Sequence, residues 1–225
     1  APLRAGIDVK PYQLEPLRKA LRMPRVSLFI ADDVGLGKTI EAGLIMRELL
    51  LRQKVHRVVV VAPPSVVLQW KGEMESRFGL GFAVMDRAYI SEMRRQRGWG
   101  INPWATHTRF IVSQALVRDE AYAGPLRDWL GEEGKQALLI LDEATSAVDS
   151  HSEDVIHTVL KDFAVGRTVF IITHSLSSAF LDLVTRIAVL EHGQLRAVGT
   201  VAELQQHAPS VLHMLQVDIP QTRAA

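Results

Sequence analysis

Residues 26–39 read VSLFIADDVGLGKT, and this stretch decides the fold that we expect. The apolar run from Val26 to Ala31 is typical of a buried strand, and a turn with two glycines follows it. From about Thr39 to Arg52, the spacing of apolar residues predicts an amphipathic helix. A strand, a glycine-containing loop and a helix in this order can bind phosphate, because the loop N–H groups and the positive end of the helix face an anion.

The loop carries the groups that phosphate and magnesium need. The expected phosphate-binding residues are Asp33, Val34, Gly35, Leu36, Gly37, Lys38 and Thr39. Lys38 would reach the β- and γ-phosphates of a nucleotide, and the Thr39 hydroxyl would bind magnesium. The usual phosphate-loop pattern has glycine at position 32, where this sequence has Asp32. A glycine-rich turn with an incidental Lys-Thr pair is the alternative interpretation.

A second candidate element is the apolar run Leu138–Leu141, which ends in Asp142 and Glu143. The carboxyl ends of parallel strands face the crevice where the phosphate loop would also lie. Asp142 would then bind magnesium, and Glu143 would orient or deprotonate the attacking water. Alternatively, the two acids cap the next helix. A further buried strand, Thr168–Thr173, is followed by His174, which would either contact a γ-phosphate or be structural.

The remaining apolar runs give the order of the elements. Further strands are predicted at Arg57–Ala62, Phe82–Met85, Arg109–Ser113, Ala137–Asp142, Arg186–Leu190 and Gln194–Val198. Helices are predicted at Pro11–Arg22 and Val66–Phe78, whereas Arg87–His107, rich in Arg, Gly and Trp, reads as a surface excursion. Alternating strands and helices predict a three-layer α/β fold. Its sheet would be mostly parallel, with helices on both faces and a C-terminal antiparallel hairpin.

Composition and charge exclude several classes of protein. Of the 225 residues, 48% are hydrophobic and 23% are charged, which excludes disordered, collagen-like and coiled-coil chains. Apolar runs such as Val58–Ala62 are far shorter than the roughly 20 residues that a membrane-spanning helix needs. Cysteine is absent, which excludes disulfides and thiol catalysis, and we expect a cytoplasmic protein without a secretory leader.

Charge is distributed unevenly along the chain. Residues 1–143 carry 21 Lys and Arg against 17 Asp and Glu, and residues 144–225 carry 5 against 8. The first part is therefore better suited to a polyanion.

Three further motifs are Tyr12-Gln13, Ile40-Glu41-Ala42-Gly43 after the phosphate loop, and Val60–Ser65 with Gln69-Trp70. With these motifs, residues 11–143 resemble the first motor lobe of Swi/Snf-type helicase-like ATPases. The resemblance implies a RecA-like P-loop NTPase fold, ATP and magnesium as cofactors, and adenine contact by Gln13. It also implies contact of double-stranded DNA with Pro63, Pro64, Ser65, Gln69 and Trp70. The Arg94–Arg97 cluster would border the same groove. The alternatives are a core position for Trp70 and a solvated face for the arginines.

The sequence from Leu138 onward resembles a second family. Residues 141–149 read LDEATSAVD, Thr173-His174 ends a strand, and a predicted hairpin precedes Val201–Leu204. These features resemble the magnesium-binding strand with D-loop, the switch histidine, and the terminal hairpin and helix of an ABC-transporter ATPase domain. The resemblance implies a γ-phosphate contact for His174. The Leu-Ser-Gly-Gly-Gln signature of that family is absent between Arg118 and Gly134, and the sequence contains no second motor lobe with an arginine finger.

Together these features predict one P-loop NTPase domain over residues 1–216, followed by a tail at 217–225. Residues 1–137 would be helicase-lobe-like, and residues 138–216 would be ABC-ATPase-like, both contributing to one sheet. The expected function is ATP binding with weak magnesium-dependent hydrolysis at best, so enzymatic turnover is left open. Besides ATP and double-stranded DNA, a second motor lobe or a partner subunit is an expected partner. The alternatives are an ABC-transporter-type ATPase subunit, a DNA-binding module, and a recombined or artificial chimera without turnover.

Overall fold

The computed structural model describes residues 27–31, 38–133, 136–142, 168–172, 185–191 and 194–210. Strands and helices follow in the order β1 (Ser27–Ala31), α2 (Lys38–Leu51), β2 (Arg57–Ala62), α3 (Val67–Phe78), β3 (Ala83–Met85), α4 (Arg87–Arg97), β4 (Arg109–Ser113), α5 (Gln114–Val117), α6 (Glu120–Glu133), β5 (Ala137–Asp142), β6 (Thr168–Ile172), β7 (Arg186–Glu191), β8 (Gln194–Gly199) and α9 (Val201–His207). Short 3₁₀ turns precede α3 at Pro64–Val66 and β4 at Pro103–Thr106. The helix predicted at Pro11–Arg22 lies outside the described residues. No helix within these ranges is both long enough and apolar enough to cross a membrane.

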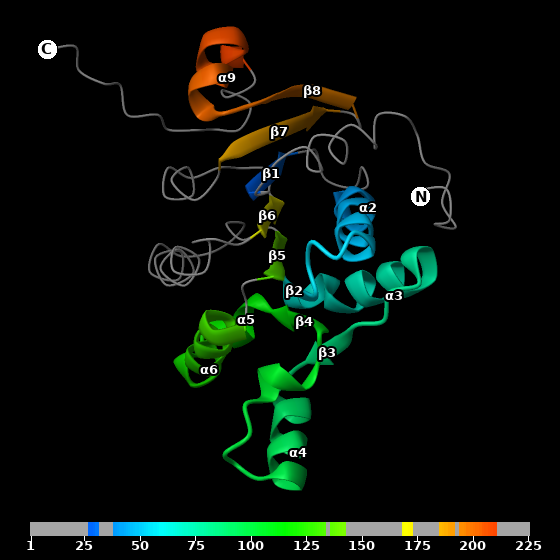
Figure 1. Cartoon of the computed structure of the whole chain (residues 1–225), viewed down its shortest axis with the longest axis vertical. Coiled ribbons are helices and arrows are strands. Elements are labelled where there is room, and N and C mark those ends of the chain that lie inside the picture. Colours follow the sequence, from blue (N-terminus) through cyan, green and yellow to red (C-terminus); the bar gives the residue numbers. More distant parts are fainter. Residues whose placement is uncertain are drawn as a thin grey trace, which may run out of the picture.

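The eight described strands form one sheet in the order β3-β4-β2-β5-β6-β1-β7-β8. Neighbouring strands are parallel from β3 to β7, and β8 runs antiparallel to β7. Figure 1 shows the sheet crossing the molecule, with β3 at one end and β8 at the other. Strands from both sides of residue 138 therefore share one sheet. The predicted α/β fold with a mostly parallel sheet and a C-terminal antiparallel hairpin is confirmed.

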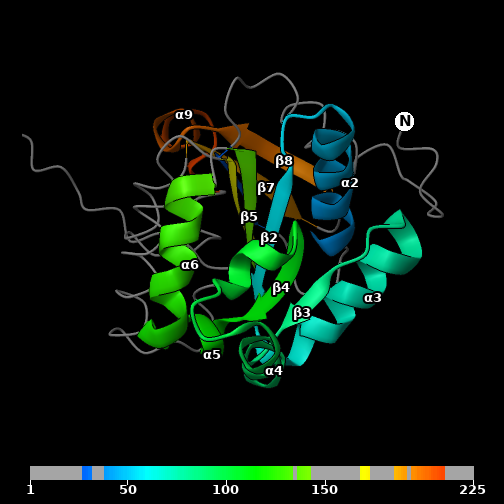
Figure 2. The ribbon, with the colours of Figure 1, turned by 60° about the horizontal axis from the view of Figure 1, so that its bottom comes forward.

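Helices cover both faces of this sheet, as Figures 1 and 2 show from two directions. α2 and α3 lie on one face, and α5 and α6 lie on the other. In β2, Val58 and Val60 pack in the core beneath α2 and α3, whereas Val59 and Val61 pack in the opposite core. Successive side chains of a strand point to opposite faces, so the valine run contributes to two cores. This double burial explains why the strand reads as an unbroken apolar run.

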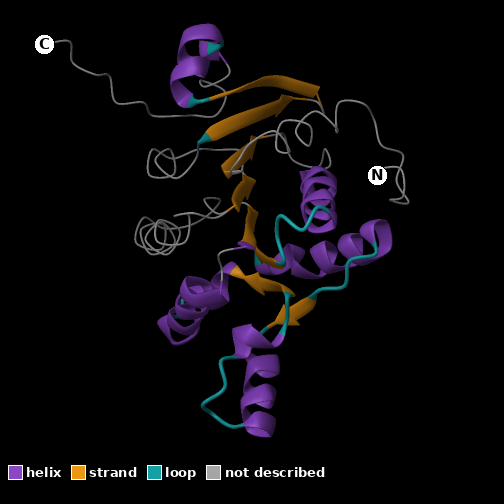
Figure 3. Cartoon of the chain, in the orientation of Figure 1, coloured by secondary structure: helices purple, strands orange, loops and turns teal. Residues whose placement is uncertain are grey.

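The stretch Arg87–His107 differs from the predicted surface excursion. It contains the helix α4, which Figure 3 shows beyond the β3 end of the sheet. Ile90 and Met93 of α4 are buried, Trp104 is buried in the following 3₁₀ turn, and Asp86 caps the first turn of the helix. The prediction was wrong because only two apolar side chains, one turn apart, anchor α4, while polar residues and arginines occupy most of its other positions.

The helices α2 and α3 pack closely at Gly43 of α2. A methyl group added to this glycine would overlap the aromatic ring of Phe78, the last residue of α3. Phe78 itself is buried in the core beneath both helices. The absence of a side chain at Gly43 therefore allows α2 to lie this close to Phe78 of α3.

Candidate functional site

The carboxyl ends of β1, β6 and β5 lie in one row across the sheet. Ile30 of β1 pairs with Ile172 of β6, and Ile172 pairs with Asp142 of β5. Neighbouring strands are about 4.8 Å apart, so about 10 Å separates Asp142 from the strand that leads into the phosphate-loop sequence. β6 lies between β5, which ends in Asp142, and β1, which leads into the phosphate-loop sequence. Both reach the same edge of the sheet, as the sequence predicts.

Asp142 belongs to the face of the sheet that α2 and α3 cover. Leu138 and Ile140, which precede it in β5 at intervals of two residues, pack in the core beneath these helices. Side chains two positions apart in a strand share a face. Thr39 lies half-buried in the first turn of α2, which covers the same face. The two expected magnesium ligands are therefore on the same side of the sheet.

Two buried side chains hold Asp142 in place. The indole Nε1 of Trp70 donates a hydrogen bond of 2.7 Å to the carboxylate Oδ2. The amide Nε2 of Gln114 donates one of 2.8 Å to the main-chain oxygen of the same residue. Trp70 comes from α3, and Gln114 begins α5 directly after β4. The orientation of the carboxylate is therefore set from one element and that of its backbone from another.

Gln114 was not among the predicted site residues. Its signal in the sequence is its position: a polar amide directly follows the predicted strand Arg109–Ser113, at the edge where Asp142 also lies. Ser113 of β4 pairs with Ala62 of β2, and Leu141 of β5 pairs with Val61, so the ends of these three strands meet. A polar residue at that position is therefore well placed to bond the backbone of β5.

Trp70 lies in the core, not on a DNA-binding surface. Its side chain is 1% exposed, so the indole offers no surface to a duplex. The inner face of α3 consists of residues spaced three or four apart: Val67, Trp70, Met74 and Phe78. This corrects the contact implied by the family resemblance and supports the core alternative. The other implied DNA contacts remain accessible, with Pro64, Ser65 and Gln69 exposed and Pro63 half-buried.

Several predicted site residues lie outside the described residues. They are Gln13, Asp33, Val34, Gly35, Leu36, Gly37, Glu143 and His174. Lys38 begins α2, but its side chain is not among those described. The roles assigned to these residues therefore stay predictions.

Thr39 and Asp142 carry the type of oxygen that magnesium binds. Magnesium usually takes one or two carboxylates and completes its shell with phosphate oxygens and water. In the described part of the chain, no three His, Asp or Glu side chains gather to form a metal site by themselves. A metal at Asp142 would therefore need oxygens from another source. The hydroxyl and the carboxylate fit a complex of magnesium with a nucleotide.

A buried carboxylate lies in the first turn of α2, close in sequence to Thr39. Glu41 is 0% exposed, although glutamate is rarely buried so completely. The positive end of the helix dipole stabilises a negative charge at this position. The sequence pointed to Glu41 only as a member of the motif Ile40-Glu41-Ala42-Gly43. A glutamate three positions after Lys38 gives no signal that its side chain is buried.

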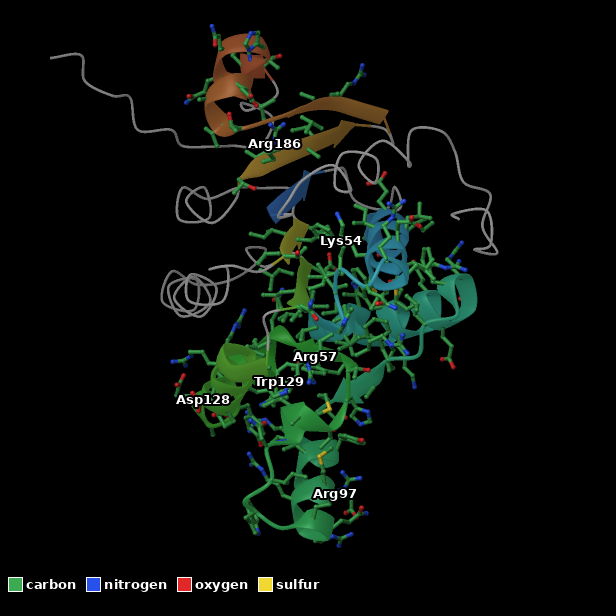
Figure 4. All side chains as sticks on the ribbon, in the orientation of Figure 1. Lys54, Arg57, Arg97, Asp128, Trp129 and Arg186 are labelled. Atoms are coloured by element: carbon green, nitrogen blue, oxygen red, sulfur yellow. The ribbon has the colours of Figure 1, made fainter. Side chains whose placement is uncertain are left out.

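The arginine cluster lies on α4. Arg95 and Arg97 are exposed, whereas Arg94 is half-buried, with its guanidinium carbon 5.9 Å from the ring centroids of Trp99 and Tyr122. Figure 4 shows Arg97 near the far end of α4, away from β2 and α3. In this view the far end of α4 lies apart from the start of α3. That the two segments border one DNA-binding groove stays a prediction.

Residues 12–171 match the family described as SNF2-related domain. The chain belongs to this family. The SNF2-related match continues through β5 and into β6, across residue 138, where the ABC-like portion was expected to begin. The similarities that follow give no support to an ABC-transporter portion or to a chimera, so that resemblance stays a hypothesis.

The SNF2-related chain is similar to the RNA polymerase-associated protein RapA of several bacteria. It is 34% identical to RapA of Pasteurella multocida over 153 residues, which cover 63% of this chain and 14% of RapA. It is 36% identical to RapA of Haemophilus influenzae over 142 residues, which cover 63% of this chain and 15% of RapA. The chain thus spans about one seventh of the length of these relatives.

Two solved structures share the fold. The Sulfolobus solfataricus SWI2/SNF2 ATPase core in complex with dsDNA aligns with a TM-score of 0.54 and 18% identity, over 78% of this chain and 34% of that one. The Pyrococcus furiosus Hef helicase domain aligns with a TM-score of 0.60 and 19% identity, over 81% of this chain and 38% of that one. At these identities the likeness concerns the fold alone, which is that of a RecA-like helicase ATPase core.

Proposed function

We propose that this chain is the nucleotide-binding lobe of a Swi/Snf-type motor, which binds ATP with magnesium and hydrolyses it slowly at best by itself. The observation that carries the proposal is the Asp142 carboxylate, held by Trp70 at the end of β5. It lies one strand away from the strand that leads into the phosphate-loop sequence. Membership of the SNF2-related family supports the same assignment.

Each proposed site residue has one role. Thr39 and Asp142 hold magnesium, which neutralises phosphate charge when it is bound. The residues proposed to contact the nucleotide or the attacking water are Gln13, residues 33–37, Lys38, Glu143 and His174. An arginine finger speeds related phosphoryl transfers by about 10³ to 10⁵. We propose that this arginine lies outside residues 1–225, because the chain spans only 14% of a RapA relative.

Lys38→Ala tests the proposal. The variant should bind magnesium-ATP at least about tenfold more weakly, because a hydrogen bond to a charged group contributes about 1.5–3 kcal/mol. Lys54→Ala, which changes an exposed lysine just after α2, is the matched control and should bind like the wild type. Affinities are measured by titration with a fluorescent ATP analogue. Glu143→Gln should keep binding and lose turnover. Equal affinity of Lys38→Ala and the wild type would contradict the proposal.

Double-stranded DNA is the proposed macromolecular partner, and it would contact the start of α3. Pro64, Ser65 and Gln69 are exposed there, just beyond the carboxyl end of β2. The Sulfolobus solfataricus protein of the same fold was solved with dsDNA. Phosphate contacts make affinity fall as salt rises, so duplex titrations at about 50 and 200 mM salt test this partner. Absent or salt-independent binding would remove DNA from the proposal. A cytoplasmic location is proposed alongside it, since the RapA relatives are named for association with RNA polymerase.

A further inference from the structure

The hydrogen bond from Trp70 to Asp142 distinguishes Trp70 from the other buried tryptophans of the described core. The two residues are 72 positions apart in sequence, and their donor and acceptor atoms are 2.7 Å apart. Trp104 and Trp129 are also buried, yet their indole Nε1 atoms have no hydrogen-bond partner among the described residues. Core packing in this chain therefore does not by itself give a tryptophan an acceptor. The bond between Trp70 and Asp142 needs an explanation beyond packing.

The geometry restricts the carboxylate more than burial alone would. An ionised carboxylate has two oxygens and about four lone-pair sites, and it rotates easily about its last bond. A charge-assisted bond at 2.7 Å occupies one site on Oδ2 and opposes that rotation. Gln114 fixes the main-chain oxygen of the same residue at 2.8 Å. Asp142 is thereby oriented before any ligand arrives.

We propose that Trp70 is a positioning residue for the metal-binding carboxylate, and that its indole N–H holds Asp142 in the orientation that magnesium requires. This inference rests on the proposed function, in which Asp142 binds magnesium. Groups that orient a metal ligand contribute about 10-fold to 100-fold to metal affinity. Trp70 touches neither metal nor nucleotide in this role. Its effect should therefore appear in the metal dependence of binding, and not in nucleotide binding without metal.

Trp70→Phe removes the N–H and keeps an aromatic ring. ATP affinity is measured by calorimetry with magnesium and again with excess chelator, and the ratio gives the gain due to metal. This ratio should fall about tenfold or more in Trp70→Phe, with the chelator value unchanged. Trp104→Phe and Trp129→Phe are matched controls, because each loses a buried indole N–H without an acceptor. Both should keep the wild-type ratio. An unchanged ratio in Trp70→Phe, or an equal fall in the controls, would overturn the proposal.

A double-mutant cycle tests the pair without nucleotide. Thermal midpoints are measured for Trp70→Phe, Asp142→Ala and the double variant. If the two side chains interact, the double variant should lose less than the sum of the single losses. The cycle of Trp129→Phe with Asp142→Ala should be additive. A wild type that binds no nucleotide would defeat the proposed function, whereas additive losses for Trp70 and Asp142 would defeat the present inference.

Discussion

At the scale of single residues, Glu203 shows how a side chain and the backbone cap one helix together. The Thr200 hydroxyl accepts the N–H of Glu203 at 3.2 Å, and the Glu203 carboxylate accepts the N–H of Thr200 at 2.8 Å. This reciprocal pair begins α9. The backbone hydrogen bond from Thr200, assisted by the charge of Arg186, lowers the pKa of the Glu203 carboxyl below its ordinary value.

A lowered pKa predicts how stability depends on pH. The cap stabilises the folded chain fully above the unfolded-state pKa of about 4.3, and this contribution is lost as the pH falls through the lower folded-state pKa. The thermal midpoint of Glu203→Gln should therefore lie below that of the wild type at pH 7, and the difference should shrink as the pH is lowered towards 3. Glu75→Gln, at an exposed position of α3, serves as the control. A difference that stays constant down to pH 3 would contradict this account.

The chemistry of a single residue could be read from the sequence more readily than its partners. Asp142 was predicted to bind magnesium because an apolar run ends in an acid, which is a local pattern. Its hydrogen bond with Trp70 joins residues 72 positions apart, and its bond with Gln114 joins residues 28 positions apart. No local spacing encodes such contacts. For that reason Trp70 was assigned to the surface by its motif, although helical spacing also places it among buried residues.

At the scale of helices and strands, the contact between α2 and α3 depends on Gly43. Gly43→Ala should destabilise the chain by about 1–3 kcal/mol, because the added methyl group overlaps the buried ring of Phe78. Gly72→Ala is the matched control, since nothing lies within 4 Å of a methyl group there. It should be neutral or stabilise by up to about 1 kcal/mol, as alanine favours a helix more than glycine does. Urea denaturation measures both, and equal effects of the two substitutions would contradict the close contact.

Strands could be predicted more accurately than helices. β2, β4 and β5 have the predicted bounds, because in each a run of buried apolar residues begins and ends abruptly. α4 was missed because its signal is weak: two buried side chains, Ile90 and Met93, among arginines and polar residues. Capping by Asp86 was the remaining local clue. A helix that buries only a narrow row of apolar side chains is hard to predict when most of its other residues are charged or polar.

At the scale of the whole molecule, the sheet is held together by pairing between strands that are distant in the sequence. β1, at the start of the described residues, lies between β6 and β7, near their end. The parallel pairs need long connections, so none of them forms locally. The order of strands could not be read from the sequence, although the alternation of elements predicted the class of fold. We propose on this basis that residues 1–216 form one domain.

One domain predicts one unfolding transition. All four tryptophans lie between residues 70 and 129, so their fluorescence reports on the first part of the sheet. Far-UV circular dichroism reports on every strand and helix. The two signals should change together with urea if the sheet unfolds as a unit. Separate midpoints would show that the parts on either side of residue 138 unfold independently.

The bond between α3 and β5 has a mechanical consequence. α3 begins at an exposed turn, and its indole at position 70 is fastened to the end of β5. Hydrogen bonds of this kind weaken beyond about 3.2 Å. A shift of α3 by about half an ångström would therefore either move the Asp142 carboxylate with the helix or break its hydrogen bond with Trp70. A displacement of α3 at its exposed first turn would therefore be transmitted directly to the carboxylate at the end of β5.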